Sequence, residues 1–437
     1  MIMLKTLKPF LLSILLFLSC QPPTSGSKKK SLSIKKDHSS TFIDNENISK
    51  KIAYNIYLEN SGSMDGYIIG ETSYKNTILQ LTSDVFQQGN IINYFVVNQE
   101  IIDINNQVKN FQEFSSFINS SQIKQYGNTK STEINKIIEM VIDNFKSKDE
   151  VAIVFSDLIY SVQGDVLNSL STNRYATKII LKRVIDKDYS LMLIRLSSQF
   201  KGNYYDMKHP NRGILIDEKR PVFAMAIGPK SEISKFDKKF RIKELSGFTN
   251  ALEFVPISKM NETTFYTILN RTNKKGSFLK ADRNSPVIHK ISDVTLDRVD
   301  KKFQFSVAID LSHLPYGYDL LTKNNYFVQS SINDKFKIVS VDKIDKIDPN
   351  DRRYQGTATH LITLSSSQLT RENQVLSIGL KTHLPNWKDW VSTLDDTTPQ
   401  GRIDKTFGIN HLIDGVAEAF GYRSGTNFFK ISLILLK

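Results

Sequence analysis

The sequence predicts two folded domains, an α/β domain over residues 51–255 and a β-sandwich over residues 285–437. Two observations carry this prediction. Between residues 51 and 255, short apolar segments alternate with segments of helical periodicity, which is typical of a doubly wound, mostly parallel sheet. From about residue 285, apolar residues tend to recur at every second position, as in half-buried antiparallel strands. A chain of 437 residues is long enough for two domains.

The elements expected in the first domain follow one another in the order of a parallel sheet with crossover helices. The first strand, residues 52–58, is short and rich in apolar and aromatic residues, as a buried strand requires. The later strands are expected over residues 91–97, 151–155, 190–197 and 221–227. The helices are expected over residues 76–88, 132–145 and 174–185, and a loop is expected over residues 200–206.

The second domain is predicted from short strands separated by turn residues such as Asp348-Pro349-Asn350. The strands are expected over residues 303–309, 326–331, 336–341, 359–364 and 375–380. The pattern indicates an immunoglobulin-like architecture, although the Cys-Trp-Cys signature of that family is missing. A C-terminal helix within residues 407–420 and a closing strand over residues 428–436 complete the domain.

Polar side chains follow the first strand directly. Glu59, Ser61 and Ser63 stand at its C-terminal end, the position at which open α/β sheets bind ligands. One carboxylate and two hydroxyls supply only oxygen donors, which suit a hard cation such as Mg²⁺ or Ca²⁺. The structural alternative is a strand-to-helix turn whose serines cap backbone groups.

The segment Glu59-Asn60-Ser61-Gly62-Ser63 resembles the Asp-x-Ser-x-Ser element of the von Willebrand factor A family. In that family it belongs to the metal-ion-dependent adhesion site. Thr132 resembles the family's later threonine, with Thr129 as the second choice, and Asp157 resembles the aspartate after its fourth strand. The family usually has Thr-Asp-Gly there, whereas this chain has Ser156-Asp157-Leu158. The resemblance extends over roughly residues 50 to 250. It implies a metal site made of Glu59, Ser61, Ser63, Thr132 and Asp157.

Each of these residues also has a purely structural interpretation. Thr132 is placed where a helix N-cap is expected, and Asp157 where a turn follows a buried strand. Glu59 departs from the family pattern, because its carboxylate reaches one methylene further than aspartate. Mg²⁺ requires near-octahedral geometry at about 2.0–2.1 Å, so the longer acid displaces a coordinated water or distorts the site. Asp65 is close enough in sequence to compensate. The resemblance implies Mg²⁺, with Mn²⁺ or Ca²⁺ as alternatives. Because Glu59 replaces the usual aspartate, a site that no longer binds a metal is a further alternative.

Two segments near this edge are expected to contact a partner. Residues 65–74 separate Ser63 from the first helix and carry apolar side chains, which indicates a lid or a partner contact. The alternative is a loop folded back on its own domain. The loop over residues 200–206 is expected at the same edge of the sheet. The candidate partner-binding residues are Asp65, Tyr67, Tyr204 and Tyr205.

The N-terminus resembles a bacterial lipoprotein signal. Lys5 and Lys8 precede an apolar stretch, residues 10–18, that is too short to span a bilayer as a mature helix. It runs into Cys20, the only cysteine of the chain. The resemblance implies removal of residues 1–19 and a lipid on Cys20, although Phe17 stands where leucine is usual. The alternative is an ordinary secretory peptide. Residues 20–50 are polar and are expected to form a disordered tether.

The charge of the chain bears on its location and partners. The formal net charge is +13, but the lysines are scattered and do not interleave with aromatic residues, so we expect no nucleic-acid partner. No acidic run follows Cys20, which favours a periplasm-facing protein, in the outer membrane rather than the inner. With a single cysteine, no intramolecular disulfide can form.

The absence of catalytic motifs favours a binding protein over an enzyme. The seven histidines form no close pair, and the chain has no nucleophile elbow and no phosphate-binding loop. We therefore expect a lipid-anchored envelope protein that binds an unidentified protein partner through a degenerate metal-ion-dependent adhesion site. The alternative is a metal-assisted hydrolase acting on phosphoester or cell-wall substrates.

Overall fold

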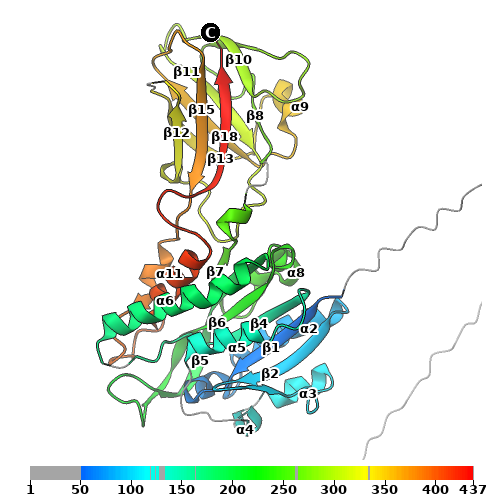
Figure 1. The fold of residues 1–437 in the computed structure, drawn as a ribbon, viewed down its shortest axis with the longest axis vertical. Coiled ribbons are helices and arrows are strands. Elements are labelled where there is room, and N and C mark those ends of the chain that lie inside the picture. Colours follow the sequence, from blue (N-terminus) through cyan, green and yellow to red (C-terminus); the bar gives the residue numbers. More distant parts are fainter. Residues whose placement is uncertain are drawn as a thin grey trace, which may run out of the picture. The chain divides into compact units, whose positions relative to one another are not determined.

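The computed structural model describes residues 51–118, 120–123, 125–126, 133–162, 164–260, 264–332 and 335–436 (Figure 1). The predicted signal peptide, the tether with Cys20, and both Thr129 and Thr132 lie outside the described residues.

The N-terminal part of the described chain is built on a seven-stranded sheet, which confirms the α/β class. Its strands are β1 (Ala53–Glu59), β2 (Ile91–Val97), β3 (Ile101–Asp103), β4 (Glu150–Ser156), β5 (Tyr189–Tyr204), β6 (Ile214–Pro229) and β7 (Phe248–Phe254). Their order is β3-β2-β1-β4-β6-β5-β7. Only β1 pairs in parallel, with β2 and with β4, and the remaining pairs are antiparallel.

The prediction of a mostly parallel sheet is therefore wrong, and the sheet is mixed. The reason is the connection after β5. That strand turns back as a hairpin, and its return strand β6 inserts between β4 and β5. The apolar pattern of β6 shows that it is buried but carries no information about its direction.

Helices cover both faces of this sheet. One face packs against α2 (Ser73–Gln87), α3 (Phe111–Phe117) and α8 (Phe236–Phe240), and the other against α5 (Ile134–Asp143) and α6 (Val166–Ile185). In β1, Tyr54 and Ile56 enter the first core and Tyr57 enters the second, as the alternation of a strand requires. The short helices here are α1 (Asp65–Ile68), α4 (Ser120–Ile123) and α7 (Lys230–Ile233).

Capping residues explain why two helices begin earlier than predicted. The Thr72 hydroxyl accepts the N–H of Lys75 at 3.2 Å and starts α2 at Ser73. The Asp165 carboxylate accepts the N–H of Leu167 at 3.0 Å and starts α6 at Val166, eight residues before the predicted start at Arg174. Apart from β5 and β6, which are longer than predicted, the other expected strands and helices are present with their ends shifted by a few residues.

The loop predicted over residues 200–206 is mostly strand. β5 continues to Tyr204, where it still pairs with Ile214 of β6. Phe200 and Ile216 are buried along this extension. Because Ser156 at the end of β4 lies opposite Phe223, and Phe223 opposite Arg195, the hairpin extends well past the C-terminal end of β4. A single strand pattern does not reveal an extension that depends on its hairpin partner.

The C-terminal part contains two further sheets of the predicted sandwich type. One sheet has the order β12-β15-β18-β10-β9 and the other β13-β14-β11-β8. Side chains of both sheets belong to one buried cluster. The strands are β8 (Tyr266–Ile268), β9 (Ser277–Lys280), β10 (Lys290–Thr295), β11 (Phe303–Ile309), β12 (Tyr326–Ser330), β13 (Lys337–Lys343), β14 (His360–Ser366), β15 (Gln374–Lys381) and β18 (Asn427–Leu435). Since β8 and β9 precede residue 285, the two sheets begin earlier than the predicted domain.

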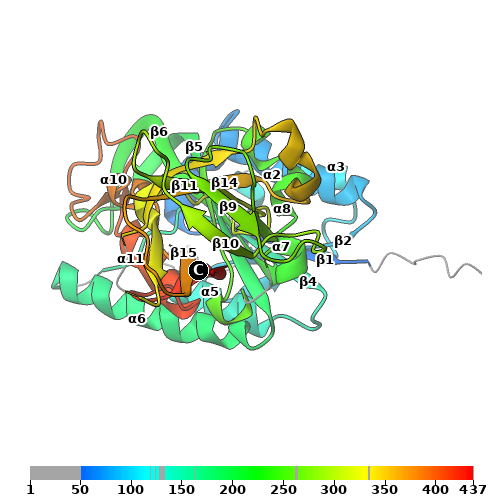
Figure 2. The same ribbon diagram turned by 90° about the horizontal axis from the view of Figure 1, so that it is seen from above.

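The C-terminal helix packs on the α/β part. α11 (Ile409–Ala419) lies beside α6, as both views show (Figures 1 and 2). Gly415 permits this contact, because a Cβ atom at this position would lie 2.7 Å from the backbone oxygen of Arg174. The preceding segment carries α10 (Trp387–Trp390), β16 (Ser392–Thr393) and β17 (Thr406–Phe407). The helix α9 (Arg352–Gln355) belongs to the connection between β13 and β14.

A buried glutamate joins the end of β7 to the segment after β11. The backbone N–H of Glu253 donates to the backbone oxygen of Tyr316 at 3.0 Å, and the Glu253 carboxylate accepts the backbone N–H of Tyr316 at 2.9 Å. Its other carboxylate oxygen has no hydrogen-bond partner among the described residues. Burial raises the pKa of Glu253 to about 7, although the Tyr316 N–H and the charge of Lys230 act in the opposite direction.

This raised pKa predicts a pH-dependent effect of Glu253→Gln. Folding binds a proton at Glu253, so its contribution to stability is complete below the unfolded pKa and is lost as the pH rises through the folded value of about 7. Glutamine keeps an acceptor for Tyr316 without the charge. The variant should match the wild type at pH 4.5 and exceed its free energy of unfolding by about 3 kcal/mol at pH 8.

Urea unfolding at both pH values measures this difference, with the exposed Glu71→Gln as the matched control, which should follow the wild type. A difference that is equal at both pH values would contradict an ionisation of Glu253.

Candidate functional site

The candidate site begins at the C-terminal end of β1. Glu59 is the last residue of the strand, and Ser61 and Ser63 lie in the turn that follows, where residues Gly62–Met64 form a 3₁₀ helix. Glu59 and Ser61 are buried, and the Ser61 and Ser63 hydroxyl oxygens lie 2.9 Å apart. Asn60 fixes the turn, because its side chain donates to the backbone oxygens of Ile123 and Tyr126 at 2.9 and 2.7 Å.

Asp157 enters the site from the end of β4. Its Oδ1 accepts the N–H of Ile159 at 3.2 Å, and the Ser156 hydroxyl accepts the N–H of Leu158 at 2.9 Å. Leu158 has φ of 53°, in the left-handed region that glycine adopts without strain. This position follows the aspartate, where the von Willebrand factor A pattern usually has glycine. A leucine in this conformation indicates a turn that the surrounding structure fixes.

The structure brings Glu59, Ser61, Ser63 and Asp157 together. Burial raises the pKa of Glu59, and the negative charge of Asp157 raises it further, while hydrogen bonds from Ser156 and Ser61 act against both. Burial also raises the pKa of Asp157, against a hydrogen bond from Ser63, the Ile159 N–H and the charge of Arg220. Two buried carboxylates therefore repel each other at this edge of the sheet.

The donor set fits a hard cation. It consists of two carboxylates and two hydroxyls, all oxygen donors, and a divalent cation between the carboxylates would remove their repulsion. Glu59 and Asp157 would hold such an ion directly, with Ser61 and Ser63 beside them. Within the described ranges no group of three or more His, Cys, Asp or Glu side chains is arranged to hold a metal. The candidate set is of a different kind, because half of its members are serines.

Two of the four predicted partner-binding residues are buried by contacts within the domain. The Tyr67 hydroxyl donates to the Pro221 oxygen at 2.6 Å, and the Tyr204 ring lies 4.6 Å from the Arg220 guanidinium. Both tyrosines are buried. Asp65 is half-buried at the start of α1. Tyr205 is 38% exposed, and its ring lies 3.2 Å from the position of a Cβ atom on Gly62. Of the four, Tyr205 therefore offers a partner the most accessible ring beside the serine turn.

The segment after Ser63 folds back on its own domain rather than forming a lid. Helix α1 packs on β5 through two glycines, since a Cβ atom on Gly202 would lie 2.9 Å from Cα of Gly66. The Tyr67 and Phe200 rings meet edge to face at 4.9 Å between centroids. Ile68 is buried here, and only Ile69 of the predicted apolar lid is exposed.

Arg220 is a residue of the site that the sequence did not predict. This buried residue of β6 stacks on Tyr204 and donates to the backbone oxygens of Pro399 and Arg402 at 2.9 and 3.3 Å. The nearby Arg195 donates to the Asp404 oxygen at 2.6 Å. A segment from the far C-terminal part of the chain thus borders the site. The one sequence signal for a buried arginine was its position directly before the apolar strand predicted over residues 221–227.

Comparison with known proteins gives no relative: no family model, no curated protein and no solved structure matches the chain. Over the part of the chain that the structure describes, no helix is long and apolar enough to cross a membrane. The fold and the site define a mixed α/β protein with two carboxylates and two hydroxyls at the C-terminal ends of neighbouring parallel strands.

The repulsion between the carboxylates predicts that Asp157→Asn stabilises the metal-free protein. Asparagine keeps acceptors for Ile159 and Ser63 but removes one of the two buried charges. At pH 8 with a chelator, we expect a gain of about 1–3 kcal/mol in the free energy of unfolding. Chemical denaturation measures it, with the exposed Asp186→Asn as a control expected within about 0.5 kcal/mol of the wild type. A less stable Asp157→Asn protein would contradict this prediction. It would show that the hydrogen bonds of the Asp157 carboxylate stabilise the fold by more than its repulsion from Glu59 destabilises it.

Proposed function

We propose that this protein is a lipid-anchored, periplasm-facing envelope protein that binds a protein partner through a von Willebrand factor A-like adhesion site. One observation carries the proposal. Glu59 and Asp157 are buried carboxyl groups at the C-terminal ends of β1 and β4, with the hydroxyls of Ser61 and Ser63 beside them. Because burial and the charge of Asp157 raise the pKa of Glu59, the two groups are costly to ionise together, and a bound cation would remove that cost.

The recognition step follows from this arrangement. A bound Mg²⁺ or Mn²⁺ would supply an open coordination position that a carboxylate of the partner can fill. Glu59 and Asp157 provide the charge that holds the ion, and the serine hydroxyls orient them through hydrogen bonds. Arg220 holds the hairpin strand and Tyr204 in place behind the site. Tyr205 is the exposed side chain beside the serine turn and would contact the partner.

Leu158 supports the resemblance on which the proposal draws. A non-glycine residue with positive φ is uncommon, and a buried leucine in this region is strained. The strain falls at the turn that presents Asp157. Selection for the position of a carboxylate explains a strained turn here better than a simple strand-to-loop connection does.

A metal-assisted hydrolase acting on phosphoester or cell-wall material is the second candidate, and one observation favours it. In the hairpin loop just after Tyr205, His209 Nδ1 lies 2.9 Å from Asp206 Oδ1, a pair that can move a proton. Metal-dependent hydrolysis of p-nitrophenyl phosphate that is lost in His209→Ala would replace the binding function with this one.

Metal binding is tested by calorimetry and thermal unfolding. Saturating Mg²⁺ or Mn²⁺ should raise the melting temperature of the wild type, because a ligand that binds only the folded state stabilises it by about 2.7 kcal/mol at 100 times Kd. Glu59→Asp should bind more tightly, since the shorter acid leaves room for a coordinated water. Asp157→Asn should lose the effect, and Asp186→Asn should keep it.

Each outcome has a definite meaning. Binding only in Glu59→Asp would show a degenerate site that has kept its fold and lost its metal. No binding heat in any variant would overturn the cation-dependent function. Crosslinking in the native envelope followed by mass spectrometry, with and without a chelator, then identifies a partner whose capture requires the metal.

The anchor is tested separately. Cys20→Ser should move the protein from the membrane fraction to the soluble periplasmic fraction, because the lipid is its proposed attachment. Fractionation and incorporation of labelled fatty acid measure this change. A wild type that takes up no label would show that the N-terminus is an ordinary export signal.

A further inference from the structure

A second region of the molecule has the features of a binding site. A groove of about 830 Å³ lies between α6, the C-terminal end of α11 and the loop that follows it. Its volume falls in the range of about 300–1,000 Å³ that is typical of ligand sites. Its wall includes Arg174, Lys178, Lys182, Ile257, Phe420 and Arg423. None of the residues that line it belongs to the candidate cation site.

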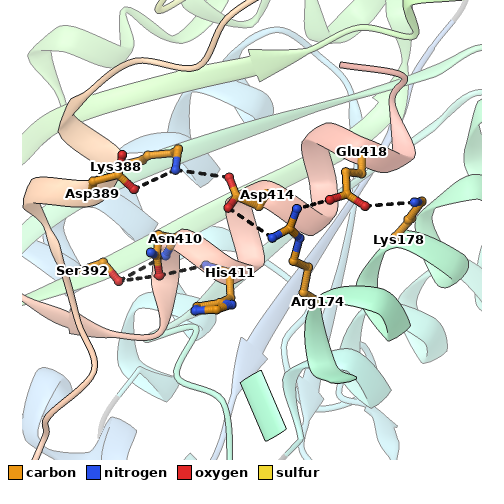
Figure 3. A network of polar contacts seen from close by, with 9 residues as sticks. All are labelled: Arg174, Lys178, Lys388, Asp389, Ser392, Asn410, His411, Asp414 and Glu418. Carbon is orange, nitrogen blue, oxygen red and sulfur yellow. Dashed lines mark hydrogen bonds and ion pairs between the residues drawn. The ribbon is translucent and has the colours of Figure 1, made fainter. Parts of the chain in front are cut away.

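The two acids of the groove are already engaged. Arg174 binds Glu418 and lies 3.7 Å from Asp414, and Lys178 lies 2.9 Å from Glu418 (Figure 3). On the other side, Lys388 bridges Asp414 at 3.2 Å and Asp389 at 2.7 Å. This network fixes the side chains of Arg174 and Lys178 of α6 against α11. It also leaves neither carboxylate of α11 free to neutralise a further charge.

Two cations of the groove remain in excess. Lys182 is one helical turn beyond Lys178 on the same side of α6, and Arg423 follows the C-terminal end of α11. Neither makes an ion pair with another residue in the described part of the chain. With four basic and two acidic side chains in its wall, the groove carries a net positive charge.

An apolar surface adjoins these cations. Tyr175 and Ile179 lie one turn apart on α6 and are 58% and 66% exposed. Each directly follows one of the basic residues of the groove, Arg174 or Lys178. A single exposed apolar residue needs no explanation, but two large ones together beside a charged groove indicate a contact surface.

We propose that this groove binds an acidic peptide segment of a protein partner, with an apolar side chain of the segment resting on Tyr175 and Ile179. Charge complementarity favours acidic side chains, with which Lys182 and Arg423 would form ion pairs. The concave shape selects a peptide over a membrane surface. Arg174 and Lys178 are recessed, with 35% and 30% of their side chains exposed, so an extended chain reaches them and a flat lipid surface does not.

The test uses the purified full-length protein and fluorescence anisotropy at about 0.15 M salt, where distant surface charges are screened. The probe is a fluorescein-labelled eight-residue peptide made of glutamates around one phenylalanine. A peptide with lysine in place of every glutamate is its control. We expect the acidic peptide alone to bind, and the double variant Lys182→Glu/Arg423→Glu to weaken its binding about tenfold. Tyr175→Ser/Ile179→Ser should weaken it about fivefold while leaving the charge unchanged.

The matched control is Lys136→Glu/Lys337→Glu, which makes the same change of charge at exposed positions of α5 and β13. It should bind the probe like the wild type. Equal weakening by both double variants would show non-specific attraction and overturn the proposal. So would equal binding of the lysine peptide, or no binding of the acidic one. Binding to vesicles of anionic phospholipid that depends on Lys182 and Arg423, without peptide binding, would replace the peptide with a membrane.

Discussion

The parallel pairing of β1 with β4 is the constraint on which the candidate site depends. The register sets Leu58 opposite Phe155, so that both strands end at the same level of the sheet. The residues that follow, Glu59 on one strand and Asp157 on the other, therefore meet in a single buried site. A shift of one residue in this register would send one of the carboxylates to the other face. The hydrogen bonds of the serine hydroxyls and the turn at Leu158 refine a geometry that the strand pairing has already set.

The hairpin formed by β5 and β6 borders the candidate site at this edge of the sheet. Because β6 inserts between β4 and β5, the extension of the hairpin stands next to the end of β4. It packs on α1 through Gly66 and Gly202, and it places Tyr205 beside the serine turn. The segment over residues 65–74, which the sequence left open as a lid, is thereby held as part of the domain. Tyr205, and not a cover of apolar residues, is the exposed side chain beside the serine turn.

The C-terminal segment between β15 and β18 completes the α/β part of the molecule. Its backbone oxygens accept hydrogen bonds from the buried guanidinium groups of Arg195 and Arg220, which also contact Thr249 and Glu218. Its helix α11 supplies the acids that pair with Arg174 and Lys178 of α6. The same packing produces both the backing of the candidate cation site and the basic groove. The two proposed binding regions thus rest on one long-range association within the chain.

The sequence by itself determined the local elements and the chemistry at their ends. Apolar patterns placed β1, β2, β4, α11 and the strands β11 to β15 and β18 to within a few residues, because burial of one face or both imposes a period that single residues reveal. They did not reveal β8, β9 or β10. The polar residues Glu59, Ser61, Ser63 and Asp157 stood out because each follows a buried strand. Only the tertiary structure decided the direction of β6, the burial of Tyr67 and Tyr204, the partners of Arg220 and the position of α11 on α6. These features depend on pairing between residues far apart in the chain, and the period of a local segment carries no information about which distant segment covers it.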